Sequence, residues 1–260
     1  MPPRVSVVVP AFNEESTLAT TLCAVLALPE VAEVIVVDDC STDRTPSILA
    51  QIAEAEPRVV AVRQAKNGGK TEALKRGFAL CTGDIVIVQD ADTEYDPTEI
   101  PTVIRPIVDG VADVVYGSRF LVRKAARVLY FYHYVANRGL TLLSNLFTNV
   151  NLTDVETGYK AFRAEIIKNM VIKSSGFGFE IEVTAKVAKL GCRMYETPIS
   201  YYGRTYEEGK KITFMDGVHA LWYILRYNLF CSLEESFVQV PNVREGWQPE
   251  LKKSAASAGI

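Results

Sequence analysis

Two aspartates separated by a single residue, Asp90 and Asp92, follow the apolar run at 84–89. The isoleucines and valines of that run predict a buried strand of a parallel sheet. Carboxylates at the end of such a strand are costly to desolvate unless a positive charge lies between them. Mg²⁺ and Mn²⁺ prefer hard oxygen ligands of this kind. The pair therefore indicates either a divalent-cation site that holds a diphosphate or a solvated loop.

Three further polar clusters also come at the ends of expected strands. They are Asn13-Glu14, Asp38-Asp39 and Ser118-Arg119. In open parallel sheets, ligands bind outside the carboxyl ends of the strands, so the clusters predict one shared ligand site. The Asp39 carboxylate could accept hydrogen bonds from ribose hydroxyls or base nitrogens. Ser41, Thr42 or Asp43 is the better candidate for capping the helix that follows.

The elements that must position these clusters alternate between strand and helix over the first 120 residues. We expect strands at 5–9, 34–37, 59–62, 85–88 and 111–116, and helices at 15–28, from about 43, at 71–80 and at 97–108. This alternation predicts an α/β fold, Rossmann-like, with a mainly parallel sheet flanked by helices on both faces.

The second half of the chain is less regular. We expect helices at 127–147, 180–189 and 212–230, a strand at 158–163, an extended segment at 193–202 and a disordered tail at 241–260. The first and last of these helices are amphipathic and rich in aromatic residues. Such helices either pack into a core or lie on a membrane, where Trp and Tyr are favoured.

A polar loop bounded by glycines spans 203–211 and carries Arg204 and Lys210. Loops of this type can close over phosphates, where their cations offset negative charge. An ordinary solvated turn is the equally simple alternative.

Several common activities are disfavoured by missing motifs. The segment 66–71 lacks the glycine that a phosphate-binding loop needs at position 64, where Gln64 stands. No Gly-x-Gly-x-x-Gly follows the first expected strand, which argues against a dinucleotide fold. The two histidines, His133 and His219, lie outside any nucleophile pattern, so hydrolytic triad chemistry is improbable.

Composition sets further bounds on the 260-residue chain. A net charge of -3 without a long basic run gives no reason to expect nucleic acid. Five widely spaced cysteines predict reduced thiols of a cytoplasmic protein. Because no run of about 18 uncharged apolar residues occurs, we expect a soluble protein, or one peripheral on the cytoplasmic face of a membrane.

Taken together, the motifs resemble glycosyltransferase family 2, with its GT-A fold, and most closely its polyprenyl-phosphate (dolichol-phosphate) mannosyltransferases. Residues 7–15 are similar to that family's Pro-x-Tyr-Asn-Glu segment, with Phe12 in place of tyrosine. Residues 36–43 are similar to its Asp-Asp-Gly-Ser-x-Asp segment, with Cys40 in place of glycine. Residues 67–70, 73–77, 90–94 and 117–119 also match, and the resemblance covers roughly residues 4 to 230.

The resemblance implies a metal-dependent, inverting glycosyltransferase. It would move a hexose, with mannose favoured, from a nucleotide diphosphosugar, with GDP-mannose favoured, to a polyprenyl or dolichyl phosphate. Mg²⁺ or Mn²⁺ would be the cofactor, and a membrane surface or a membrane-anchored subunit would be a partner. One GT-A domain would span 1–235, with a nucleotide-sugar half at 4–120 and an acceptor half at 121–235. The segments 137–139, 153–160 and 204–210 carry the likeness to enzymes with a lipid-phosphate acceptor.

The same resemblance assigns roles to individual residues. The donor would contact Pro10, Phe12, Glu14, Val37, Asp39, Asp90, Ala91, Asp92, Arg119, Arg204 and Lys210. The metal would be held by Asp90, Asp92 and Glu94, and the acceptor phosphate by Arg119 and Arg138. The catalytic residues would be Asp92, Arg119, Arg204 and Lys210. A phosphate acceptor is already anionic at neutral pH, so the missing catalytic histidine is expected.

Other functions stay open at this point. A family 2 enzyme could instead use UDP-glucose or a soluble acceptor. A non-catalytic subunit could bind the nucleotide sugar and recruit a membrane partner, although intact carboxylates and a basic loop argue against it. A nucleotidyltransferase, which would need a nucleoside triphosphate, is a more distant alternative.

Overall fold

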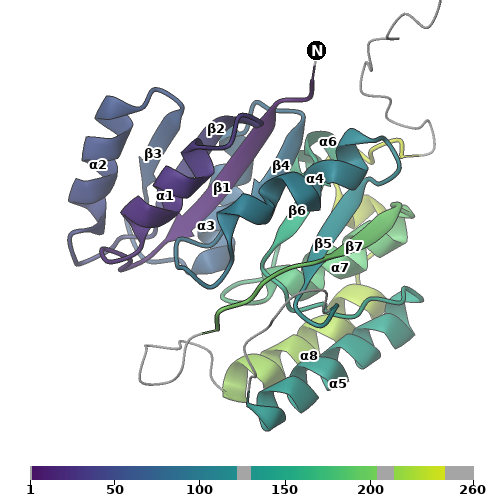
Figure 1. Cartoon of the computed structure of the whole chain (residues 1–260). Helices are drawn as coiled ribbons and strands as arrows, with labels where there is room; N and C mark the ends of the chain where they lie inside the picture. Colours follow the sequence, from purple (N-terminus) through teal and green to yellow (C-terminus); the bar gives the residue numbers. More distant parts are fainter. Residues whose placement is uncertain (1, 122–129, 204–213, 244–260) are drawn as a thin grey trace, which may run out of the picture.

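A seven-stranded sheet forms the middle layer of the fold (Figure 1). The computed structural model describes residues 2–121, 130–203 and 214–243. Its strands are β1 (Val5–Ala11), β2 (Val31–Asp38), β3 (Val59–Arg63), β4 (Ile85–Val88), β5 (Val114–Ser118), β6 (Lys160–Arg163) and β7 (Met194–Pro198). They lie in the order β3-β2-β1-β4-β6-β5-β7, and only β6 runs antiparallel to its neighbours. The predicted mainly parallel sheet is confirmed.

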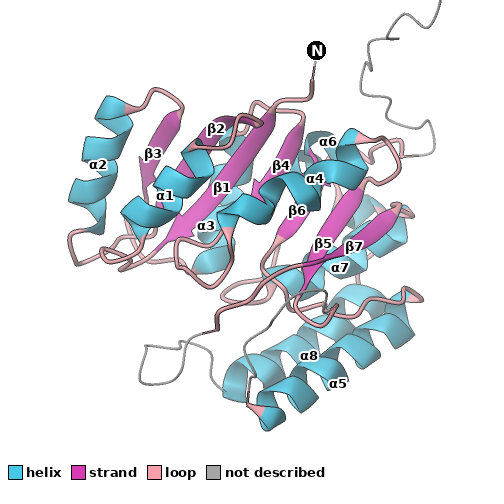
Figure 2. Ribbon diagram, viewed as in Figure 1, coloured by secondary structure: helices cyan, strands magenta, loops and turns pink. Residues whose placement is uncertain are grey.

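Helices cover both faces of the sheet, as Figure 2 shows. One core cluster joins the sheet to α1 (Leu18–Leu26), α2 (Thr45–Ala55) and α4 (Ile100–Val108), which follows the short 3₁₀ helix η1 (Pro97–Glu99). A second cluster joins the opposite face to α3 (Lys70–Leu80), α6 (Ala164–Asn169) and α7 (Phe179–Leu190). Two further helices, α5 (Phe131–Thr148) and α8 (Phe214–Leu229), lie side by side and pack on α7. A 3₁₀ turn, η2 (Glu234–Ser236), comes near the end of the described chain.

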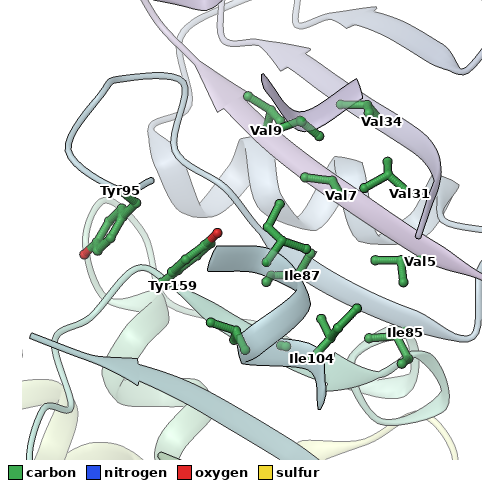
Figure 3. Close-up of a cluster of buried hydrophobic side chains, with 14 of the residues drawn as sticks. Val5, Val7, Val9, Val31, Val34, Ile85, Ile87, Tyr95, Ile104 and Tyr159 are labelled. Atoms are coloured by element: carbon green, nitrogen blue, oxygen red, sulfur yellow. The ribbon is translucent and has the colours of Figure 1, made fainter. Parts of the chain in front are cut away.

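Alternation along the central strands divides the core between the two faces. Val5, Val7 and Val9 of β1 belong to the first cluster, whereas Val8 belongs to the second. Figure 3 shows the first three beside Ile87 of β4. Successive side chains of a strand point to opposite faces, so a strand covered on both sides needs apolar residues at every position. This requirement explains the continuous apolar runs in the sequence.

Some element boundaries differ from those expected. Helix α1 begins at Leu18 rather than residue 15, and β5 begins at Val114 rather than residue 111. Ser41 and Thr42 do not cap α2, which begins at Thr45. The N-cap position is Arg44, which makes no side-chain cap bond, and Asp43 just before it accepts a hydrogen bond of 2.9 Å from the Thr45 amide with its Oδ1. The Ser41 hydroxyl is engaged elsewhere, since its Oγ accepts a bond from the Asn13 amide.

Two expectations reach beyond the described residues. The tail expected at 241–260 lies outside them from residue 244 onward, and the start of the helix expected at 127–147 falls in the gap at 122–129. Within the ranges that are described, no helix is long and apolar enough to cross a membrane.

Candidate active site

The expected polar clusters all lie at the carboxyl ends of the sheet's parallel strands. Strand β1 is parallel to β2 and β4, and β5 runs in the same direction because β6 is antiparallel to both β4 and β5. The carboxyl ends of β1, β2, β4 and β5 therefore point the same way, as the sequence predicted.

The loops after β1 and β2 are bonded to each other. Asn13 donates its backbone N–H to Ser41 Oγ at 2.9 Å, and its Oδ1 accepts from the Thr42 amide at 2.8 Å. The Glu14 amide donates to Thr45 Oγ1 at 2.9 Å. Asn13 and Cys40 both have left-handed backbone conformations, with φ of 54° and 61°. The two segments predicted to contact the nucleotide-sugar donor are thus joined by hydrogen bonds.

Asp39 holds the glycine-containing loop that precedes α3. Its Oδ1 accepts from Gln64 Nε2 at 2.6 Å and from the Gly68 amide at 2.8 Å, and its Oδ2 accepts from the Gly69 amide at 2.7 Å. An ionised carboxylate has about four acceptor positions, so these three bonds leave room for one more hydrogen bond from a ligand hydroxyl or N–H. The contact predicted between Asp39 and the nucleotide-sugar donor stays a prediction.

Lys70 balances the charge of Asp90. Its Nζ lies 2.9 Å from Asp90 Oδ1, 3.0 Å from Oδ2 and 3.3 Å from Glu180 Oε1. Burial opposes the charged form of this ammonium, but Asp90 and Glu180 outweigh it and raise the pKa of Lys70 above its ordinary value. Sequence reasoning missed Glu180, although Lys70 stood in the segment weighed as a phosphate-binding loop.

The carboxylates after β4 suit a hard cation in chemistry but do not converge on one point. Asp92 Oδ1 accepts from the Glu94 amide at 3.1 Å, and Glu94 Oε2 accepts from the Tyr201 hydroxyl at 2.9 Å. Across the described residues, no three acidic, thiol or imidazole side chains are grouped closely enough to hold a metal ion. Metal ligation by Asp90, Asp92 and Glu94 stays a prediction.

The remaining predicted donor contacts fall into three groups. Val37 and Ala91 are buried in the core clusters, so a ligand could reach only their backbone. Pro10 and Phe12 are partly exposed at the end of β1, and Glu14 is buried beside them. Arg204 and Lys210 lie outside the described residues.

Arg119, at the end of β5, is locked to Asp154. The guanidinium donates from Nε to Oδ2 and from Nη2 to Oδ1, both at 2.7 Å, and the Arg119 amide donates to Oδ2 at 3.1 Å. Burial opposes its charge, but Asp154 raises the pKa of Arg119 well above its ordinary value. A bidentate pair of this kind fixes both position and orientation.

Arg138 of α5 approaches the same place from the helix side. Its guanidinium donates to the Thr153 carbonyl at 3.0 Å and lies 5.9 Å from the centre of the Phe120 ring. The Arg119 guanidinium lies 5.7 Å from that ring centre. The structure therefore places the two arginines predicted to hold one phosphate around the same ring and against the same segment, Thr153-Asp154.

Tyrosines line this region, and among them only Tyr159 lies in a segment, 153–160, that the resemblance singled out. The Tyr95 ring stacks on Tyr159 with centroids 5.3 Å apart, and Figure 3 shows both rings. The Tyr95 hydroxyl accepts a bond of 3.0 Å from the Gly158 amide, and the Tyr201 ring lies 5.1 Å from the Arg119 guanidinium carbon. Nothing in the sequence spacing of Tyr95 and Tyr201 sets their rings apart from core aromatics.

A buried ionic group lies behind the arginines and Lys70. Glu180 Oε2 and Glu156 Oε1 are buried and have no hydrogen-bond partner among the described residues. Burial and the nearby Glu180 raise the pKa of Glu156 to about 7. Burial lowers the pKa of Lys160 to about 8, although its Nζ donates to the carbonyls of Val155 and Thr157. The carboxyls of Glu156 and Glu180 and the amine of Lys160 thus place charges of opposite sign next to the site.

Beside the arginines, α5 and α8 expose an extensive set of large apolar side chains. We call this set, together with Phe230 directly after α8, the α5/α8 apolar surface, and its helical members are Phe131, Tyr132, Tyr134, Val135, Leu142, Leu146, Met215, Val218, Leu221, Trp222, Leu225 and Leu229. Phe131, Tyr132, Leu142, Leu146 and Phe230 are at least 70% exposed. Large exposed apolar patches mark interaction sites.

Comparison with known proteins adds a family match. Residues 6–171 match glycosyl transferase family 2. An undecaprenyl-phosphate mannosyltransferase of Micrococcus luteus is 31% identical over 224 residues, which cover 80% of this chain and 87% of that protein. A polyprenol monophosphomannose synthase of Mycolicibacterium smegmatis is 30% identical over 209 residues, which cover 77% of this chain and 78% of that protein.

A solved structure shares the fold. It is the crystal structure of glucosyl-3-phosphoglycerate synthase from Mycobacterium tuberculosis in complex with Mn²⁺, UDP and glucosyl-3-phosphoglycerate. The TM-score is 0.66 at 22% identity, and the match covers 87% of this chain and 80% of that one. At this identity, the likeness bears on the fold alone.

Proposed function

The chain belongs to glycosyl transferase family 2, and on that premise we propose that it transfers a mannosyl group from a nucleotide diphosphosugar to a polyprenyl phosphate. It is a glycosyltransferase with the GT-A fold expected from the sequence. The relatives from Micrococcus luteus and Mycolicibacterium smegmatis support a lipid-phosphate acceptor, since their names specify mannosyl transfer to such lipids.

The observation that carries the proposal is the placement of two arginines around the Phe120 ring, beside an apolar surface. Arg119 and Arg138 supply the paired positive charge that a phosphate monoester requires. Arg138 lies on α5, the same helix that exposes Tyr134, Val135 and Leu142. A polyprenyl phosphate has the matching chemistry, because its anionic head adjoins a long apolar chain.

The proposed reaction needs positioning more than proton transfer. The acceptor phosphate oxygen would attack the anomeric carbon from the face opposite the leaving nucleoside diphosphate, which inverts the configuration. That oxygen is already anionic at neutral pH, so no strong general base is required. Arg119 and Arg138 would hold and orient the phosphate, and Arg204 and Lys210 would face the departing diphosphate.

We also propose Mg²⁺ or Mn²⁺ as the cofactor, with Asp92 as its main ligand and Asp90 and Glu94 beside it. Carboxylate oxygens suit these ions, and the solved neighbour was crystallised with Mn²⁺. Asp90 is already balanced by Lys70, which is why we give Asp92 the leading role. When bound, the ion would supply positive charge next to the leaving diphosphate.

The α5/α8 apolar surface is proposed to rest on a membrane, on the cytoplasmic face where nucleotide sugars are available. A membrane-anchored subunit that covers the same surface is the alternative occupant. Aromatic and long aliphatic side chains of this kind favour the membrane interface.

The test is a transfer assay with extraction into organic solvent. The purified protein would be mixed with Mn²⁺, a short polyprenyl phosphate and, in separate reactions, radiolabelled GDP-mannose and UDP-glucose. We expect label from GDP-mannose to enter the organic phase. Label from UDP-glucose alone would correct the donor and keep the acceptor. Transfer only to water-soluble products, or none with nucleotide binding intact, would contradict the lipid acceptor.

A further inference from the structure

Glu196 forms an unusually dense set of hydrogen bonds on an edge strand. It is the middle residue of β7, which within the described chain pairs only with β5. Its carboxylate accepts from the Thr153 amide at 2.9 and 3.0 Å, from Thr153 Oγ1 at 3.0 Å and from the Asp154 amide at 3.2 Å. Three donors from two successive residues thus converge on one side chain.

The two residues that Glu196 holds are the ones that orient both arginines. The Thr153 carbonyl accepts from Arg138, and the Asp154 carboxylate accepts three bonds from Arg119. Thr153 Oγ1 is also 2.6 Å from Ser118 Oγ, next to Arg119 in the chain. The segment at 153–154 is therefore the common anchor of both guanidinium groups.

The placement of this carboxylate is costly without its partners. Burial raises the pKa of Glu196, whereas the hydrogen bonds from Thr153 and Asp154 oppose that shift. Bonds to an ionised acceptor are stronger and shorter than neutral ones. A structural clamp of this kind is rigid, and it acts on two groups that lie on different elements, β5 and α5.

We propose that Glu196 is a positioning residue for the acceptor phosphate. By fixing the backbone at 153–154, it directs Arg119 and Arg138 toward one phosphate group without touching that group itself. The inference rests on the proposed lipid-phosphate acceptor, and it adds a residue that the sequence reasoning did not single out.

Two substitutions separate positioning from bulk stability. Glu196→Gln keeps a carbonyl oxygen where Oε1 accepts its three bonds, whereas Glu196→Leu removes every acceptor. With a short polyprenyl phosphate, we expect Glu196→Leu to raise the acceptor KM by about tenfold or more, because small misplacements of binding groups are costly. The donor KM should change by less than about twofold, and Glu196→Gln should stay within about threefold of the unsubstituted protein.

Glu33, on β2 and five strands away from β7, offers a matched control. Its carboxylate accepts from Ser6 Oγ, from Thr82 through both amide and hydroxyl, and from the Gly83 amide. Glu33→Leu should therefore lower the melting temperature while leaving the acceptor KM unchanged. Equal rises in acceptor and donor KM for Glu196→Leu, or an acceptor KM that also rises in Glu33→Leu, would overturn the proposal.

Direct binding of the short polyprenyl phosphate, measured by calorimetry in detergent, separates this inference from the proposed function. If the unsubstituted protein binds the lipid but transfers no sugar, and Glu196→Leu loses that binding, the proposed reaction fails and the inference stands. If the unsubstituted protein does not bind the lipid, both fail.

Discussion

Cys40, in the loop after β2, has a strained backbone where the sequence departs from its family pattern. Its φ of 61° lies in the left-handed region, which glycine adopts without cost and which disfavours a side chain by about 1–2 kcal/mol. Cys40→Gly relieves that strain but adds freedom to the unfolded chain. We expect the free energy of unfolding to rise by about 0.5–1 kcal/mol, measured by urea denaturation.

Cys23→Gly is the matched control, because Cys23 is exposed in α1 and has an ordinary helical backbone. There the same change should lower the free energy of unfolding by about 0.5 kcal/mol. A loss of stability in both variants would show that Cys40 is not strained.

Asp92→Asn tests the carboxylate given the leading metal role. An asparagine keeps the oxygen that accepts from the Glu94 amide but loses the negative charge. We expect kcat to fall by about 100-fold or more, with the melting temperature unchanged. The two measurements are a transfer assay at saturating Mn²⁺ and thermal unfolding. Unchanged turnover would remove Asp92 from the catalytic residues.

Glu156 makes stability depend on pH in a defined direction. Its raised pKa means that the folded chain keeps a proton which the unfolded chain has already lost above about pH 4.5. The contribution of protonated Glu156 to the free energy of unfolding is therefore complete below that pH and is lost as the pH rises through about 7. Glu156→Gln cannot ionise, so it should be more stable than the unsubstituted protein by about 2 kcal/mol at pH 8 and equal at pH 4.5. Paired urea titrations at both pH values check this, and a gain at pH 4.5 alone would contradict it.

At the scale of whole elements, the α5/α8 apolar surface gives the clearest prediction. Leu146 and Trp222 are exposed on α5 and α8, at 76% and 55%. Replacing either by glutamate removes an apolar contact worth about 1.5–3 kcal/mol when fully buried in a membrane. We expect binding to liposomes to weaken about tenfold or more in each variant, measured by co-sedimentation.

Val111→Glu is the control for that experiment. Val111 is 45% exposed and lies near the end of α4, away from α5 and α8. It should leave liposome binding unchanged. Equal binding by all three variants would mean that the surface does not contact lipid.

The succession of elements could be predicted from the sequence, because alternating strands and helices leave their periods in the chain. The reversal of β6 could not. A strand's apolar pattern is the same in either direction, and β6 reaches its place between β4 and β5 only after the long α5 segment. Tertiary pairing, rather than local pattern, decides that direction.

The same distinction applies to the site. Residues at strand ends, such as Asp90 and Arg119, could be predicted because the topology of a parallel sheet gathers them. Their ion pairs could not, since Glu180 and Asp154 come from helix and loop positions far along the chain; the resemblance singled out the segment that contains Asp154, but not its pairing with Arg119. Glu196 lies on β7, where its alternation looks like that of any edge strand.

At the scale of the molecule, we propose that residues 1–235 fold as one domain, although the halves at 4–120 and 121–235 have different roles. Within the described chain, β5 pairs only with β6 and β7, which both come from the second half. A fragment of residues 1–120 would leave β5 without a neighbour and would remove α6 and α7 from one face of the sheet.

We therefore expect the 1–120 fragment not to fold by itself. Circular dichroism and amide dispersion in NMR spectra would measure this, with the full chain as the control. A cooperative unfolding transition in the fragment would show two separable domains.

The edge strand β7 has a consequence for solubility. An open edge offers unpaired N–H and C=O groups to the strands of other molecules, which is a route to aggregation. Here the strand has five residues, ends at Pro198, which has no N–H to donate, and carries the charged Glu196 at its centre. Arg105 and Asp109 of the neighbouring α4 segment, joined by an ion pair, line the groove that flanks Tyr195. A short strand with a charge at its centre and a proline at its end is disfavoured as a pairing site for a strand of another copy.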